Sequence, residues 1–191
     1  MVSRFLLLLI AFSAAFPAAG AEVAGVNIPD TDQQLVLNGA GLRKRAFFQV
    51  YAIGLYLPEK QAAAADAIGA AGAKRVAIYM LRDVGAEQFA GALTDGMKDN
   101  VSEAEMKAFE PRLKQLVAIM AEMKEAKKGL RITLDWLPAG GTQVTVDGKA
   151  AGTPIPGDDF YRALLKIWLG ENPVQADLKK ALLGETRGEK Q

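Results

Sequence analysis

The sequence predicts one α+β domain in which an early group of strands pairs with a late antiparallel meander, and one layer of helices covers a face of the sheet. Three observations carry this. The longest β-rich run extends from Asn38 to Pro58. Apolar residues then recur at helical spacing from Ala86 to Met123. Alternating strands follow from Leu130 to Thr153, with a hairpin motif at Asp147-Gly148. No repeat or break in composition indicates a second domain.

The first residues have the composition of a secretory signal peptide. Arg4 supplies a positive charge, Phe5–Phe12 is an apolar run, and Ala19-Gly20-Ala21 is a small-x-small cleavage site. We therefore expect residues 1–21 to be removed and residues 22–188 to form the mature domain. The apolar run is too short to span a bilayer comfortably. The expected location is periplasmic or secreted, with no stable membrane anchor.

The composition excludes several classes of chemistry. The chain has no Cys and no His, which excludes disulfides, thiol catalysis, Ser-His-Asp triads and zinc sites of the usual kind. No Asp/Glu cluster has metal-ligand spacing, so we expect no metal and no cofactor. Of 23 Lys and Arg side chains, only Arg4 lies in the predicted signal peptide, so the mature chain balances its 22 Asp and Glu. Net charge thus gives no reason to expect nucleic acid or an anionic membrane as partner.

The first elements of the mature chain are expected to be short. Glu22–Gly25 is expected to be loose, and Val26–Ile28 to be a short strand. Gln33–Leu37 alternates weakly and leads into Gly39-Ala40-Gly41. No helix follows these glycines and a third glycine is missing, so they do not form a dinucleotide-binding loop. We expect them to permit a tight turn or bulge.

One long strand is expected after the glycines. From Phe47 onward both of its faces are largely apolar, which indicates a strand covered on both sides. Arg43 lies at its beginning, on the same face as Tyr51 in a period-two reading. A cation at the mouth of an apolar face is a candidate binding site, although an ion-paired surface residue is the simpler interpretation.

The remaining elements are expected as a helix, a strand, two helices, three strands and two helices. Their expected ranges are Gln61–Ile68, Lys74–Arg82, Ala86–Lys98, Ser102–Gly129, Leu130–Leu137, Thr142–Val146, Lys149–Thr153, Asp158–Gly170 and Val174–Leu183. Ser102 and Glu105 form a capping box. Pro111 is expected to interrupt or restart its helix, and Asp158 to cap a later one.

Taken together, these motifs resemble the chalcone isomerase-like family, in particular an exported bacterial branch. The resemblance covers Asn38 to Leu183, and its motifs are Gly39–Arg43, Ala52–Leu57, Gly152–Pro156, Leu169–Pro173 and Asp177–Lys179. It implies the chalcone isomerase fold, an open-faced β-sandwich with a large antiparallel sheet backed by a layer of helices. It also implies a ligand cleft between sheet and helices.

In the plant enzymes of this family, an arginine holds the oxyanion of an enone substrate during an intramolecular ring closure. Lysine, tyrosine and threonine side chains assist it. The resemblance places that arginine at Arg43 and a hydroxyl, in place of the threonine, at Tyr51. The lysine falls on Met80 and the tyrosine on Phe89.

Two further positions of the enzyme pattern are apolar in this chain. The enzyme's asparagine falls on Gly96, and a late-helix threonine or serine falls near Ile167. The resemblance therefore implies a cleft that keeps one cation and has lost most of its hydrogen-bond donors. Such a cleft suits a small apolar or amphiphilic ligand with an anionic head, as in the family's fatty-acid-binding branch.

Three functions remain open at this point. The first is non-catalytic binding of a fatty acid or similar apolar carboxylate by the residues Arg43, Tyr51, Met80, Phe89 and Ile167. The second is an intramolecular lyase, a chalcone isomerase-like isomerase, with Arg43 and Tyr51 as its catalytic residues. The third is an envelope module that binds a partner protein, which a large exposed apolar patch on the helices would favour. Core packing is the alternative role for Tyr51 and Phe89.

Overall fold

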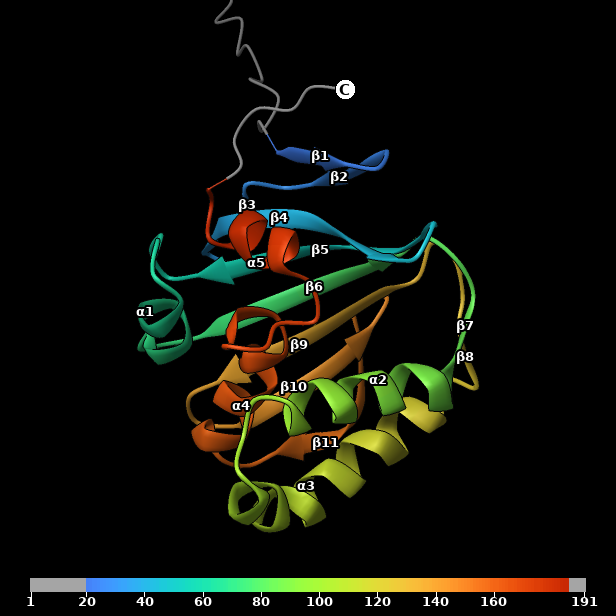
Figure 1. The fold of residues 1–191 in the computed structure, drawn as a ribbon, viewed down its shortest axis with the longest axis vertical. Helices are drawn as coiled ribbons and strands as arrows, with labels where there is room; N and C mark the ends of the chain where they lie inside the picture. The colour runs from blue at the N-terminus through green and yellow to red at the C-terminus, as the bar shows by residue number, and fades with distance from the viewer. Residues whose placement is uncertain (1–19, 186–191) are drawn as a thin grey trace, which may run out of the picture.

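Seven strands form one antiparallel sheet, and all five helices contribute side chains to the core on one face of it (Figure 1). The computed structural model describes residues 20–185. The strands follow the spatial order β11-β10-β9-β6-β5-β4-β3. Their bounds are β3 Thr31–Asp32, β4 Leu35–Arg45, β5 Phe48–Leu57, β6 Lys74–Met80, β9 Arg131–Leu137, β10 Gly141–Val146 and β11 Lys149–Ile155.

The other elements are the helices and two small two-stranded sheets. The helices are α1 Ala64–Gly69, α2 Ala86–Lys98, α3 Glu103–Ala121, α4 Asp158–Leu169 and α5 Ala176–Leu182. The paired short strands are β1 Ala21–Val23 with β2 Val26–Ile28, and β7 Val84–Gly85 with β8 Glu125–Ala126. This arrangement confirms the predicted α+β fold. The predicted signal peptide falls almost entirely on residues outside those described.

The centre of the sheet joins early and late parts of the chain. β6 pairs with β9, and Ile78 lies directly opposite Ile132. Both side chains are buried in the main core, which lies between the sheet and the helices. The opposite face carries a smaller apolar cluster around Ile28 and Tyr56, to which the β1–β2 hairpin contributes. No helix within residues 20–185 is long and apolar enough to cross a membrane.

The long β-rich run is two strands, so the prediction of one strand was wrong. β4 and β5 form a hairpin that turns at Ala46-Phe47, where Ala46 has φ +52°. Arg43 lies directly opposite Tyr51 across this hairpin. Opposite residues of an antiparallel pair project to the same face. The expectation that Arg43 and Tyr51 share a face therefore holds, but pairing between strands is the reason.

The glycines of the Gly39-Ala40-Gly41 motif lie inside β4 rather than in a turn. A bulge follows Leu37, which is one of the two features, a tight turn or a bulge, that we expected the glycines to permit. The glycines also make room for α5. A Cβ atom on Gly39 would collide with the carbonyl oxygen of Ala181, and one on Gly41 would lie 2.7 Å from Cδ1 of Leu178. The motif therefore brings the last helix close to the sheet.

Several smaller expectations were wrong. The segment expected to be loose after residue 21 belongs to the β1–β2 hairpin. α3 continues through Pro111, because Phe109 and Leu113 hold it in the core on both sides of the proline. It ends at Ala121 rather than at Gly129. Gly157, not Asp158, precedes α4 as its N-cap.

Other expectations were confirmed. α2 has the predicted bounds, and the predicted capping box of Ser102 and Glu105 begins α3. Asp147 and Gly148 have φ +48° and +77°, as the predicted turn of the β10–β11 hairpin requires.

Candidate functional site

A row of three residues crosses β4, β5 and β6 on the face that the helices cover. Arg43 lies opposite Tyr51, and Tyr51 lies opposite Met80. The sequence placed all three in the candidate site, and the pairing of the strands brings them together. The row lies close to the turn of the β4–β5 hairpin.

Tyr51 is buried, and its hydroxyl accepts a hydrogen bond from Nε1 of Trp168 on α4 at 3.0 Å. An indole nitrogen can only donate. The hydroxyl of Tyr51 is therefore the acceptor, and its own proton has no acceptor among the described residues. Phe89 on α2 packs edge-on against the Tyr51 ring, with the ring centres 6.5 Å apart. Two helices thus fix the ring while the O–H donor stays unused.

Arg43 is half-buried, and within the described part of the chain it makes hydrogen bonds only to uncharged oxygens. Its guanidinium donates to the carbonyl oxygen of Lys44 at 2.5 Å and to Oε1 of Gln175 at 3.5 Å. Gln175 also accepts from the backbone N–H of Lys44 and donates to the carbonyl of Leu42, which attaches the start of α5 to β4. Within residues 20–185 no carboxylate forms an ion pair with Arg43. The described residues thus hold this charge in position without supplying a counter-ion.

Electrostatics at Tyr51 reflect both its burial and this cation. Burial raises the pKa of Tyr51 above its ordinary value. The hydrogen bond from Trp168 and the positive charge of Arg43 act in the opposite direction, but they are smaller effects. Tyr51 is therefore a neutral hydrogen-bond donor at physiological pH.

The three apolar residues of the predicted site line the same core. Met80, Phe89 and Ile167 are between 1% and 4% exposed and belong to one continuous cluster with Tyr51 and Trp168. The side chains fill this space in the structure, which agrees with core packing. A ligand-binding role for the three residues stays a prediction.

Gly96 shows why one enzyme position has no polar side chain here. A Cβ atom on Gly96 would lie 2.8 Å from Cγ2 of Ile167 and 3.3 Å from Cγ1 of Val174. α2 and α4 therefore touch at this point. An asparagine side chain would not fit without separating the two helices.

A cavity of about 480 Å³ lies at a different place, which the sequence did not indicate. It is bordered by α1, the beginning of α3 and the end of α4, and shares no residue with the row at Arg43. Two lysines, Lys166 and Lys179, line it together with acidic side chains such as Glu105 and Glu171. Opposite charges are already mixed there, so no single ligand charge is favoured.

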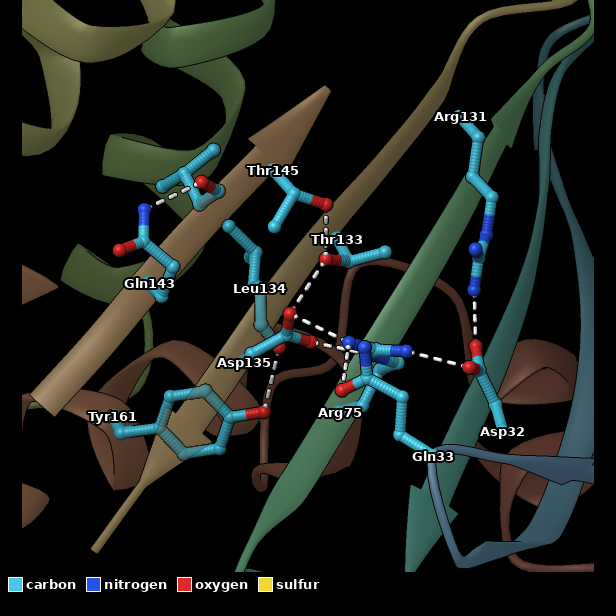
Figure 2. A network of polar contacts seen from close by, with 11 residues as sticks. Asp32, Gln33, Arg75, Arg131, Thr133, Leu134, Asp135, Gln143, Thr145 and Tyr161 are labelled. Carbon is cyan, nitrogen blue, oxygen red and sulfur yellow. Dashed lines mark hydrogen bonds and ion pairs between the residues drawn. The ribbon is translucent and has the colours of Figure 1, made fainter. Parts of the chain in front are cut away.

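The opposite face of the sheet holds a buried polar network that the sequence analysis missed (Figure 2). Arg75 on β6 donates to both carboxylate oxygens of Asp135 on β9, at 2.6 and 2.8 Å, and to Asp32 at 2.6 Å. Asp32 also pairs with Arg131, and Thr133 donates to Asp135 at 2.8 Å. Burial lowers the pKa of Arg75, but the bonds to Asp135 and Asp32 outweigh it and raise that pKa.

This network is a structural device rather than a second site. Its charges pair with one another, and it links the short strand β3 to the centre of the sheet. The available signal was the presence of Arg75 and Asp135 within otherwise apolar strands. No group of Asp and Glu side chains within residues 20–185 is arranged to hold a metal ion.

Comparisons with known proteins agree with this fold. A family model described as chalcone isomerase-like matches residues 20–184. A search of curated proteins gave no match. The crystal structure of a fatty-acid binding protein from Arabidopsis thaliana has a similar fold, with a TM-score of 0.67 and 16% sequence identity over 84% of this chain and 93% of that one. The chain belongs to the chalcone isomerase-like family.

Proposed function

We propose that the protein binds a fatty acid or a similar apolar carboxylate and does not catalyse a reaction. The carboxylate would lie between the guanidinium of Arg43 and the hydroxyl of Tyr51. The tail would lie among the apolar side chains between the sheet and α2. Membership of the family and the fold shared with a plant fatty-acid binding protein support this proposal.

The observation that carries it is a cation without an ion pair and a hydroxyl proton without an acceptor at the edge of the core. Among the described residues, Arg43 bonds only to neutral oxygens, and the O–H of Tyr51 bonds to none, while its oxygen accepts from Trp168. A carboxylate accepts hydrogen bonds and carries the negative charge that would pair with the guanidinium of Arg43. Charge-assisted hydrogen bonds are about twice as strong as neutral ones, which favours an anion over a carbonyl ligand.

The tail requires a rearrangement of side chains. Met80 and Phe89 are almost fully buried, so binding must move them apart. The side chain of Met80 is unbranched and can refill an irregular space. The beginning of α2 is joined to its neighbour by the β7–β8 pair and by a hydrogen bond from the N–H of Ala86 to the carbonyl of Lys124 at 3.0 Å. We infer that the rearrangement is confined to side chains between the sheet and α2.

Loss of donors argues against the alternative of an intramolecular lyase. The side chains at Met80, Phe89 and Ile167 provide no hydrogen-bond donor, and Gly96 provides no side chain at all. Loss of one oxyanion donor costs about 2.7–4 kcal/mol in the transition state. A panel of hydroxychalcones tests this alternative: cyclisation above the uncatalysed rate, abolished by Arg43→Ala, would establish the enzyme and overturn the proposal.

We further infer that the chain is exported and that residues 1–21 are removed. The charge, apolar run and cleavage motif of the sequence support this. Mass spectrometry of the protein recovered from cell fractions tests it. We expect a mature chain beginning at Glu22 in the periplasmic or secreted fraction, and an uncleaved cytoplasmic chain would contradict the inference.

Binding in solution tests the central proposal. We expect the purified protein to bind a long-chain fatty acid and Arg43→Ala to weaken binding by about 10- to 100-fold, as for loss of a hydrogen bond to a charged group. Arg45→Ala is the matched control, because Arg45 lies on the same strand but is exposed. Absence of binding, or equal loss in both variants, would contradict the proposed site.

A further inference from the structure

The turn of the β4–β5 hairpin exposes two aromatic side chains. Phe47 is 100% exposed and Phe48 is 57% exposed. The two other exposed large apolar side chains within residues 20–185 are less exposed, Val117 at 37% and Leu137 at 40%. An exposed phenylalanine ring gains little from folding, and two adjacent exposed rings form an apolar patch on the surface. Such a patch is a candidate contact surface.

The backbone at this turn is also unfavourable. Ala46 has φ +52°, a conformation that ordinarily favours glycine or asparagine. The two-residue turn is thus formed by Ala46 and Phe47, neither of which is a usual turn residue. The hairpin presents its aromatic residues despite this local cost.

Several cations lie on the segments next to the exposed rings. Lys44 and Arg45 lie on the hairpin itself and are both exposed. The guanidinium of Arg82 lies over the Phe48 ring, 4.4 Å from its centre. Asp83 accepts a hydrogen bond from the backbone N–H of Lys128 at 2.7 Å, which brings exposed Lys127 and Lys128 to the same end of the sheet.

We define the basic tip as the two phenylalanines, Phe47 and Phe48, with the five cations Lys44, Arg45, Arg82, Lys127 and Lys128. Backbone bonds hold its three segments together: Leu81 donates to the carbonyl of Val50 at 3.0 Å, and Gly129 donates to that of Met80 at 2.8 Å. Figure 1 shows the β4–β5 turn at the same end of the sheet as β7 and β8. The exposed acids Asp83 and Glu125 lie at the same end of the sheet. The basic tip as defined nevertheless holds five cations.

We propose that the basic tip docks on the surface of an anionic phospholipid bilayer. Lys and Arg are attracted to anionic headgroups by about 1 kcal/mol each near the surface. Exposed aromatic rings gain by entering the boundary between headgroups and acyl chains. The cations of the tip thus suit the anionic headgroups, and its two aromatic rings suit the boundary between headgroups and acyl chains. The inference concerns a separate surface and does not require the proposed fatty-acid site.

The position of the tip connects it with that site. Arg43 lies on the same strand, adjacent to Lys44 in the chain, so a docked hairpin holds Arg43 at the membrane surface. Free fatty acids partition into bilayers and expose their carboxylates there. The protein would then exchange its ligand with the membrane without releasing it into water.

Site-specific fluorescence tests the docking, because the chain has no cysteine. Phe47→Cys labelled with an environment-sensitive dye reports on the tip, and Val117→Cys, on α3, is the matched control. We expect the emission of the dye at position 47 to increase several-fold on vesicles of phosphatidylglycerol and phosphatidylcholine, and to stay unchanged on phosphatidylcholine alone. All variants contain the same apolar N-terminal residues, which could bind vesicles equally in each of them. The criterion is therefore whether the dye at position 47 itself responds.

Two groups of variants define the interaction. Lys44→Ala with Arg45→Ala, measured through a label at Phe48→Cys, is expected to weaken vesicle binding roughly 25-fold, and added salt to weaken it further. Arg43→Gln is expected to weaken fatty-acid binding by about 10- to 100-fold while the label at position 47 still responds to anionic vesicles, so failure of either proposal is recognised separately. A label that stays in water, one that responds equally at position 117, or one that responds to protein concentration without vesicles would overturn the proposal.

Discussion

The Nε1 atom of Trp168 donates a hydrogen bond of 3.0 Å to the hydroxyl of Tyr51. This bond determines how Tyr51 can act. Trp168 takes one lone pair of the hydroxyl, and the proton of Tyr51, which has no acceptor among the described residues, is left for a ligand beside Arg43. The bond also joins α4 to the centre of the sheet, so it contributes to stability as well as to the candidate site.

Tyr51→Phe is expected to lower the free energy of unfolding by about 1–3 kcal/mol, because it leaves the buried N–H of Trp168 without an acceptor. Denaturant unfolding of the single variant, of Trp168→Phe and of the double variant measures the coupling. We expect the double variant to lose less than the sum of the single losses. Strict additivity would show that the bond contributes nothing.

Alkaline pH is expected to destabilise the protein through its buried tyrosines. Burial raises the pKa of Tyr51, Tyr56 and Tyr161 in the folded state. Below pH ~10 both states keep these protons, whereas above it only the unfolded state loses them. The free energy of unfolding should therefore fall by about 1.4 kcal/mol per pH unit for each tyrosine.

Burial lowers the pKa of Lys74, so this lysine makes the free energy of unfolding rise with pH, opposite to the tyrosines. That rise ends near the ordinary lysine pKa of about 10.4. The tyrosine slope is therefore best measured above that pH. Tyr51→Phe should reduce the slope of the free energy of unfolding against pH by the contribution of one tyrosine. Tyrosinate absorbance and denaturant unfolding together measure this. Tyrosinate formation at Tyr51 in the folded protein near pH ~10 would contradict its burial.

Arg75→Met is expected to lower the free energy of unfolding by about 3–5 kcal/mol, because it leaves the Asp135 carboxylate buried without its guanidinium. Arg75→Met combined with Asp135→Leu should restore much of that loss. Thermal or denaturant unfolding of both variants provides the comparison. If the double variant is as unstable as the single one, the cost arises from lost packing rather than from an unpaired charge.

Gly39→Ala is expected to cost about 1–3 kcal/mol, because its Cβ would collide with the carbonyl of Ala181 and push α5 from the sheet. Gly91→Ala is the control. Gly91 lies in α2 with open space around it, so alanine there should stabilise the helix by about 0.5–1 kcal/mol. Changes of the same sign in the two variants would contradict the close approach of α5.

The sequence predicted the fold class and most of the elements because their apolar spacing is regular. It failed at the β4–β5 turn for a physical reason. Between Leu42 and Ile53 there is no Gly, Pro, Asn or Asp, so Ala46-Phe47 carries none of the residues that ordinarily mark a turn. At Pro111 the sequence predicted an interruption that the structure does not have, because tertiary packing holds α3 together across the proline.

The candidate site was predictable only in part. The family resemblance identified Arg43 and Tyr51, and strand pairing placed them opposite each other. The role of Trp168 was not predictable, since the sequence cannot show which of many apolar residues on α4 reaches Tyr51 over a separation of 117 residues. The partners of Arg75 were hidden for the same reason: Asp32 and Asp135 are 43 and 60 residues away.

The most direct test of carboxylate recognition is a ratio of affinities. A long-chain fatty acid and its methyl ester have the same tail but differ in charge, so their ratio isolates the head group from packing and from damage to the fold. We expect wild type to prefer the acid by about 10- to 100-fold and Arg43→Gln to bind both with similar weak affinity. An acid preference that survives in Arg43→Gln would show that Arg43 does not hold the carboxylate.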